Sequence, residues 1–170
     1  MAAKLQNNFD IPEERDVSFP PAHTAEHLLN QTMIRIFGCE RSFNAHIERK
    51  KSKMSFRLDH KPTRQEEKEI ERRMGELINE DLPVTFEFVT RDELEERLQE
   101  GGLEAESAIS LDRLPDDASD TIRLVRIGDY DVCPCIGKHV RSTSQIGRFE
   151  MLGTNWDEHE RLFRVRFKIV

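Results

Sequence analysis

Two short motifs that lie far apart in the chain place the strongest constraint on its fold. His23 and His27 stand four residues apart at the start of a predicted helix, so both imidazoles lie on one face, one turn apart. Cys135 and His139 flank a tight segment that contains Gly137. Three nitrogens and one sulfur suit Zn²⁺. We therefore expect a fold in which the two motifs meet around one ion.

Neither motif is informative by itself. A solvated helix start is the plain structural interpretation of His23 and His27. Both spacings together arise by accident at roughly the two-per-cent level in a chain with six histidines and three cysteines. The metallopeptidase pattern H-E-x-x-H needs Glu at position 24, where this chain has Thr24, so a peptidase mechanism is not supported.

Length and composition predict one soluble globular domain. The chain has 170 residues, with 35% charged and 36% hydrophobic residues, which is typical of a modest core. A net charge of -7 argues against nonspecific binding to DNA or to a membrane surface. The polar N-terminus does not resemble a signal peptide, so we expect a cytoplasmic protein with reduced thiols available for a metal. The oligomeric state stays open.

Two basic stretches interrupt the acidic average and could hold phosphates. One is the turn at 49–53 and the other is the alternation at 161–168. For each stretch, a solvated turn or the polar face of a strand is the alternative. The candidate phosphate contacts are Lys50, Lys51, Lys53, Arg164 and Arg166.

The predicted fold is α+β, with helices packed on a largely antiparallel sheet. We expect residues 1–21 to form an N-terminal arm and residues 22–170 a single domain. Capping boxes at Thr63 and Thr90 predict the starts of two helices, and Gly38 predicts the end of the first one. The remaining predicted elements are a hairpin at 43–58, strands at 84–89, 121–127, around 146–152 and 162–170, and a loop at 103–120 that borders a site.

With these motifs in place, the chain resembles a known family. The stretches HTAEHLLN and CIGKHVRSTSQIGRFEML are similar to the editing domain shared by alanyl- and threonyl-tRNA synthetases and by the freestanding AlaX trans-editing proteins. The resemblance implies hydrolysis of the ester that links a wrong amino acid, commonly serine, to tRNA, with the acceptor end of aminoacyl-tRNA as partner. It also implies Zn²⁺ bound by His23, His27, Cys135 and His139.

The chain departs from the family pattern beside the thiolate. Cys133 stands where the family usually has an acidic residue, so a carboxylate that could orient water or the substrate amine is missing there. Cys133 could replace Cys135 as ligand, act as a spare thiol, or be a small buried side chain, although the Cys-x3-His spacing favours Cys135. Ile136 and Lys138 occupy variable places, so the amino-acid specificity stays open. We include Cys133 and Lys138 among the candidate substrate contacts.

Hydrolysis of an activated ester needs a positioned water and a stabilised oxyanion more than a strong nucleophile. Zn²⁺ could lower the pKa of a bound water toward ~7 or polarise the carbonyl. Four protein ligands would instead close a tetrahedral ion, as in structural sites. Our hypothesis takes His23, His27 and Cys135 as firm ligands and His139 as the ligand that doubles as base, so these four are also the candidate catalytic residues.

Three functions stay open at this stage. The first is trans-editing of Ser-tRNA(Ala), Gly-tRNA(Ala) or Ser-tRNA(Thr), because the chain carries no recognisable ATP-binding motif of a synthetase core. The second is a non-catalytic, zinc-stabilised module, descended from an editing domain, that binds tRNA or a protein. The third is a hydrolase of a small ester or free aminoacyl compound that does not need tRNA.

Overall fold

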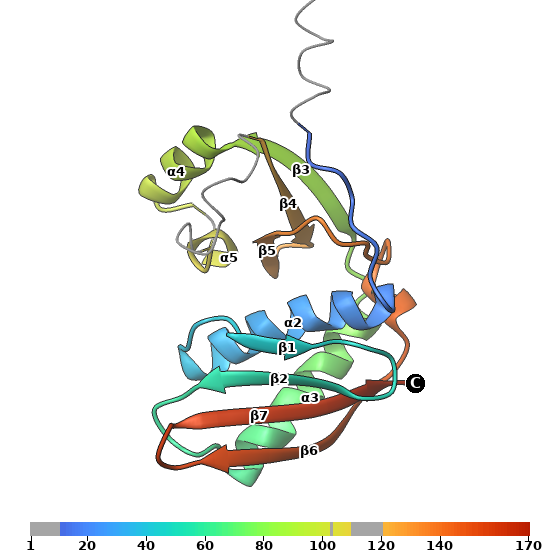
Figure 1. Cartoon of the computed structure of the whole chain (residues 1–170), viewed down its shortest axis with the longest axis vertical. Helices are drawn as coiled ribbons and strands as arrows, with labels where there is room; N and C mark the ends of the chain where they lie inside the picture. The colour runs from blue at the N-terminus through green and yellow to red at the C-terminus, as the bar shows by residue number, and fades with distance from the viewer. Residues whose placement is uncertain (1–10, 103, 110–120) are drawn as a thin grey trace, which may run out of the picture.

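The protein folds into two antiparallel sheets and a set of helices that pack on them, as a computed structural model describes for residues 11–102, 104–109 and 121–170 (Figure 1). The predicted α+β class is confirmed. The helices are α2 (Pro20–Phe37), α3 (Arg64–Asn79), α4 (Arg91–Gln99), the short α5 (Glu104–Ser107) and the 3-10 turn η2 (Thr143–Ile146). The strands are β1 (Asn44–His46), β2 (Ser52–Arg57), β3 (Val84–Thr90), β4 (Thr121–Ile127), β5 (Asp131–Pro134), β6 (Phe149–Asp157) and β7 (Leu162–Ile169).

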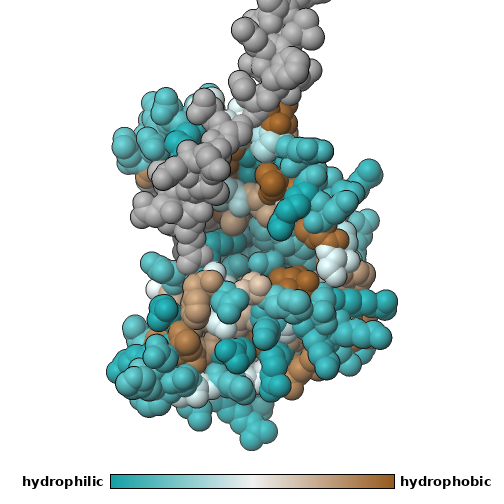
Figure 2. All heavy atoms as spheres, in the orientation of Figure 1, coloured by the Kyte–Doolittle hydropathy of each residue, from teal (hydrophilic) through white to brown (hydrophobic). Residues whose placement is uncertain are grey.

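The larger sheet has the strand order β1-β2-β7-β6 and buries one face against α2 and α3. Strand β7 shows why, because Phe163, Val165 and Phe167 alternate with exposed side chains and are buried in the main core. Met54 of β2 lies opposite Val165 and is also buried. The other face of this sheet is solvent-exposed, and Figure 2 shows it covered mostly by hydrophilic residues.

A smaller sheet, with the order β3-β4-β5, lies on the other side of α2 (Figure 1). Helix α2 contacts both β5 and β7, so it is the layer between the two sheets. A second apolar cluster beneath α4 and α5 includes Leu94, Ile122 and Val132. The sequence predicted one sheet, because alternation marks strands but does not indicate which strands pair.

The helix signals in the sequence are confirmed. Thr63 and Thr90 each accept a hydrogen bond from the backbone N–H three residues on, at 3.1 Å, and both capping boxes are complete. Gly38 ends α2 in the left-handed conformation at φ 65°, which glycine adopts without a side-chain clash. Within the described ranges, no helix combines the length and the apolar character that crossing a membrane requires.

Several predicted boundaries are wrong. Helix α2 begins at Pro20, because proline fits the first turn of a helix, so the extended arm ends at residue 19. The strand expected around 146–152 runs from Phe149 to Asp157, and η2 occupies the preceding residues. Strand β5 was not predicted. The loop predicted at 103–120 contains α5, while residues 103 and 110–120 lie outside the described part of the chain.

Candidate metal centre

The first half of α2 carries two histidines of the candidate centre. Phe19 precedes the helix in an extended conformation, and Pro20 and Pro21 begin it. His23 and His27 follow one turn apart and both are buried, and His23 contacts Cys135 and Lys138 of the segment after β5. Two imidazoles on one buried helix face can reach the same ion.

The segment after β5 carries the thiol and the remaining histidine. Arg123, which is only 4% exposed, fixes this segment by donating from Nε to the Cys135 carbonyl at 2.7 Å and from Nη2 to the Gly137 carbonyl at 2.6 Å. The arm runs beside it, with the Arg15 N–H donating to the Ile136 carbonyl at 2.7 Å. A β-carbon at Gly137 would lie 2.5 Å from His23 Cε1, so glycine is what allows the segment to approach the helix.

These two segments bring the four predicted donors together. One ligand atom each from His23, His27, Cys135 and His139 lies within 4.8 Å of the others. Cys135 Sγ is 3.4 Å from His23 Nε2, and the His23 and His139 rings stack with centroids 4.1 Å apart. The predicted meeting of the two motifs is present in the fold, while the roles of these residues as ligands and catalytic groups stay predictions.

Two of the three ring nitrogens that face away from the cluster have hydrogen-bond partners of their own, and the third, on His27, lies at ion-pair distance from a carboxylate. His23 Nδ1 donates to the Lys138 carbonyl at 2.9 Å, and His139 Nδ1 lies 2.9 Å from the Thr24 hydroxyl. His27 Nδ1 lies 3.7 Å from a carboxylate oxygen of Asp131. Metal-bound histidines usually have such partners, which fix the orientation of the ring.

The donor set fits a borderline-soft cation such as Zn²⁺. Among the described residues, His139 Nε2 and His27 Nδ1 are buried without a hydrogen-bond partner, and a nitrogen that faces an ion, as His139 Nε2 would here, is expected to lack one. Burial lowers the pKa of His139 to about 4, so its ring is neutral near pH 7. Burial opposes ionisation of Cys135, but hydrogen bonds from His139, His23 and His27 bring its pKa far below the usual value. Neutral imidazole and thiolate are the forms that bind metals.

His27 is held by a buried network of charges. Burial opposes its protonation, but the nearby Asp131 carboxylate and Cys135 thiolate raise its pKa well above the usual value, so metal binding would release a proton from this ring. Asp131 is fully buried and accepts hydrogen bonds from Arg41 at 2.8 Å and from Gln31 at 2.9 Å. Sequence reasoning missed Asp131, because one acidic residue in an apparent loop gives no local signal.

Comparisons with known proteins agree with this architecture. Residues 122–166 match the family described as the threonyl and alanyl tRNA synthetase second additional domain. The chain is 32% identical over 137 residues to an alanine–tRNA ligase of Halorubrum lacusprofundi, over 78% of this chain and 13% of that ligase. The chain belongs to this family.

Two further known proteins are similar in sequence to this chain. An alanine–tRNA ligase of Treponema denticola is 30% identical over 128 residues, which cover 75% of this chain and 20% of the ligase. The alanyl-tRNA editing protein AlaX-L of Pyrococcus horikoshii is 28% identical over 146 residues, which cover 85% of this chain and 32% of that protein. The chain thus spans less than a third of the length of any of these three relatives.

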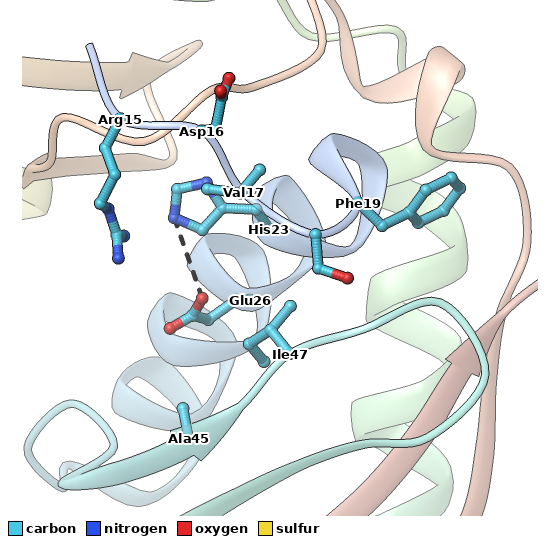
Figure 3. A pocket seen from close by; sticks show the side chains of 9 residues that line it. Arg15, Asp16, Val17, Phe19, His23, Glu26, Ala45 and Ile47 are labelled. Carbon is cyan, nitrogen blue, oxygen red and sulfur yellow. Dashed lines mark ion pairs between the residues drawn. The ribbon is translucent and has the colours of Figure 1, made fainter.

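A cavity of about 320 Å³ opens beside the candidate metal centre (Figure 3). Its walls come from the arm, from α2 and from the first strand of the hairpin. His23 lies in one wall, and Glu26 points into the space from the same helix, one turn later. Sequence reasoning missed Glu26, although its position three residues after His23 was a usable signal. The lining residues include Arg15, Val17, Phe19, His23, Glu26 and Ile47.

The remaining predicted contacts lie in different places. Cys133, on β5, is partly buried, and burial raises the pKa of its thiol. Lys138 is half exposed and pairs with Asp16 of the arm at 2.7 Å. Lys50 is exposed in the hairpin turn.

The other basic candidates lie away from the metal centre. Lys53 of β2 lies opposite Arg166 of β7 on the exposed face of the larger sheet, and Arg164 lies two residues along. Helix α2 packs on the opposite face of that sheet, so the fold does not bring these side chains to the four donors. It does join the two basic stretches into one surface, where His46, Lys51, Lys53 and Arg166 line a hollow of about 370 Å³.

Proposed function

We propose that this chain hydrolyses the ester between tRNA and a wrong amino acid, acting in trans on Ser-tRNA(Ala), Gly-tRNA(Ala) or Ser-tRNA(Thr). The observation that carries the proposal is the convergence of four metal donors within 4.8 Å, beside a cavity large enough for a small aminoacyl group. The relation to the alanyl-tRNA editing protein AlaX-L supports it. The proposal puts the protein in the cytoplasm, where charged tRNA is used.

In this proposal, His23, His27, Cys135 and His139 hold Zn²⁺. Bound zinc would supply a Lewis acid for the ester carbonyl or for a water molecule. The chain's own contribution is a Cys135 thiolate, a neutral His139 ring, and hydrogen bonds that hold the rings of His23 and His139 from behind. His139, neutral and held by the Thr24 hydroxyl, is the residue we assign as base.

The phosphates of the acceptor end need cations in a protein whose net charge is negative. We assign this role to the exposed face of the larger sheet, where Lys53, Arg164 and Arg166 are neighbours, and to Lys50 and Lys51 in the adjoining turn. A patch of one sign on an otherwise acidic protein binds polyanions locally rather than over the whole surface. Lys138 and Cys133 complete the proposed substrate contacts.

The direct test is to follow ester loss from Ser-tRNA(Ala), Ser-tRNA(Thr) and Gly-tRNA(Ala), with and without a chelator. We expect hydrolysis of at least one of the three, its loss on chelation and its return when Zn²⁺ is added. A zinc-loaded protein that hydrolyses none of them would refute the catalytic proposal. Salt-sensitive binding of acceptor-stem RNA separates a tRNA deacylase from a hydrolase of small esters, which would show none.

A zinc-stabilised binding module is the second candidate. The observation that favours it is the number of donors, because four protein ligands complete the tetrahedron of a structural zinc site. Such a module would bind tRNA, or a protein, and leave every ester intact. His27→Ala should lower zinc content under either candidate, and unchanged zinc stoichiometry would count against the site itself.

A further inference from the structure

Glu26 is the carboxylate nearest to the metal donors on the cavity side. It lies on α2, one turn after His23, and its Oε2 is 3.9 Å from His23 Nε2. Its side chain is 22% exposed, through the cavity that it lines. In Figure 3 the carboxylate points into the space between His23 and the hairpin residues Ala45 and Ile47. Glu26 is not one of the four converging donors, so it is placed beside an ion rather than as its ligand.

In the part of the chain that the structure describes, no lysine or arginine side chain forms an ion pair with the Glu26 carboxylate. Of the ion pairs among the described residues, the one that includes Glu26 joins it to His23, whose Nε2 belongs to the metal cluster. Arg41 is close enough for Glu26 to raise its pKa, but both terminal nitrogens of Arg41 donate to the Asp131 carboxylate. Pairing with a bound cation would stabilise a partly buried carboxylate that has no such partner.

The cavity around Glu26 fits one end of an aminoacyl ester. Val17, Phe19 and Ile47 line it with apolar side chains, and Glu26 lies next to His23, one of the four candidate metal donors. The arm also lines it with the polar residues Arg15, Asp16 and Ser18. In an aminoacyl ester the carboxyl group is consumed by the ester bond, so a small neutral amino acid carries a single formal charge, on its α-ammonium group. That group is one carbon away from the carbonyl that reacts.

We propose that Glu26 binds the α-ammonium group of the aminoacyl ester and thereby positions the ester carbonyl at the metal centre. This inference rests on the proposed function. It makes Glu26 a determinant of specificity, because a substrate whose α-nitrogen is acylated has no charge to offer. Peptidyl-tRNA belongs to that class, so the same carboxylate would protect chains under synthesis from hydrolysis.

The test compares two non-hydrolysable ligands by calorimetry with the zinc-loaded protein. One is 3′-seryl-amino-3′-deoxyadenosine, in which an amide replaces the ester, and the other is its N-acetyl derivative. We expect the wild-type protein to bind the free amine at least about tenfold more tightly. Glu26→Gln should remove this preference, and Glu26→Asp should keep part of it. Glu95→Gln, which removes an exposed carboxylate from α4, should keep all of it.

The possible results of this experiment separate the inference about Glu26 from the proposed function. Unchanged zinc content and melting temperature in Glu26→Gln would show that the variant is folded. If the wild-type protein hydrolyses mischarged tRNA but binds both ligands equally, the inference about Glu26 is wrong and the proposed function stands. If Glu26→Gln weakens both ligands to the same extent, Glu26 acts on another group and the inference is again wrong. If neither ligand binds and no ester is lost, both fail.

Discussion

Asp131 holds His27 and Arg41 in one buried network, so a single change there should affect metal affinity and stability together. Asp131→Asn keeps the shape but removes the charge that Arg41 faces at 2.8 Å. Removing one partner of a buried ion pair typically costs about 3–5 kcal/mol. Loss of the partner behind a metal-bound histidine typically costs about 10- to 100-fold in metal affinity. Zinc competition titration and urea unfolding would measure the two effects.

Asp129→Asn is the matched control for that experiment. Asp129 lies two residues earlier, in the turn before β5, and is exposed. We expect this variant to unfold within about 0.5 kcal/mol of the wild type and to bind zinc normally. Equal effects of the two substitutions would show that the Asp131 carboxylate does not support His27.

Gly137 is the second residue at which a small change should be felt at the metal centre. An alanine β-carbon there would lie 2.5 Å from His23 Cε1 and 2.9 Å from Val17 Cγ1, so the segment that carries Cys135 would have to move away from α2. We predict that Gly137→Ala lowers zinc stoichiometry, measured by atomic absorption on the purified protein.

Gly75→Ala is the control, because it makes the same chemical change at a position where we expect no loss of zinc. Gly75 lies inside α3, and a β-carbon there meets no atom within 4 Å. Alanine in a helix interior should stabilise the protein by about 0.5–1 kcal/mol without altering zinc content. Loss of zinc in both variants would point to a general effect on folding rather than to the contact with His23.

Some residues of the candidate site could be predicted from the sequence, and others could not. His23, His27, Cys135 and His139 could be found because their types and spacings have few other uses. Thr24 and Asp131 could not, because their roles arise from neighbours that are distant in the chain: His139 for Thr24, and Arg41 and His27 for Asp131. A partner supplied by folding leaves no local pattern.

At the scale of elements, α4 and α5 are held on the smaller sheet by one buried carboxylate. Glu106 of α5 pairs with Arg97 of α4 and, at 2.9 Å, with Arg126 of β4, and its side chain is 7% exposed. Burial would raise the pKa of Glu106, but hydrogen bonds from Arg126 and Arg97 more than offset it and leave the pKa below its usual 4.5. The ionised form is therefore the one that favours the folded state.

The pH dependence of this contact follows from the direction of the shift. A carboxyl group whose pKa is lowered by folding contributes stability above its unfolded pKa and loses it as pH falls through the folded pKa. We predict that Glu106→Gln destabilises the protein by about 1–2 kcal/mol near pH 7, and that the difference shrinks as pH falls below 4.5. Urea unfolding from pH 3 to 7, with Glu96→Gln as an exposed control, would measure it. A difference independent of pH would refute the ionic origin.

Among the helices and strands, too, some could be predicted from the sequence and others could not. Helices with capping boxes could be placed, since the signal is local and chemical. Strand β5 could not, because it has four residues, includes a buried aspartate and a proline, and is held by pairing with β4 alone. The division into two sheets was missed for the same reason, because pairing is a property of the whole fold.

For the whole molecule, the candidate metal centre joins two structural units, the larger sheet with α2 and the smaller sheet, which also share the main apolar core through Val84, Val125 and Ile127. His23 and His27 belong to α2, which is part of the core of the larger sheet, whereas Cys135 and His139 follow β5 of the smaller sheet. Zinc would therefore act as a cross-link between them. We predict that chelation lowers hydrogen-exchange protection in β4 and β5 by at least about tenfold and leaves β2 and β7 within about threefold. Zn²⁺, but not Mg²⁺, should restore it. Uniform loss in both sheets would show that the ion does not connect two units.

The exposed face of the larger sheet supplies the last test, because it separates tRNA binding from chemistry at the metal centre. Lys53 and Arg166 face each other across β2 and β7, on the opposite side of the sheet from α2. Replacing both with alanine should weaken tRNA binding and reduce the slope of its salt dependence by about 1–2, since each phosphate contact contributes about 0.7–0.9. Zinc content should not change.

The matched control also removes two positive charges, but from another part of the surface. Lys61 and Lys68, both exposed, lie in the turn before α3 and on α3 itself. Their replacement by alanine should leave the salt slope within about 0.5 of the wild-type value, because a charge outside the contact surface releases no counterions on binding. If the Lys53 and Arg166 variant behaves like this control while still hydrolysing mischarged tRNA, the acceptor end reaches the metal centre from the other side, past the arm and Arg15.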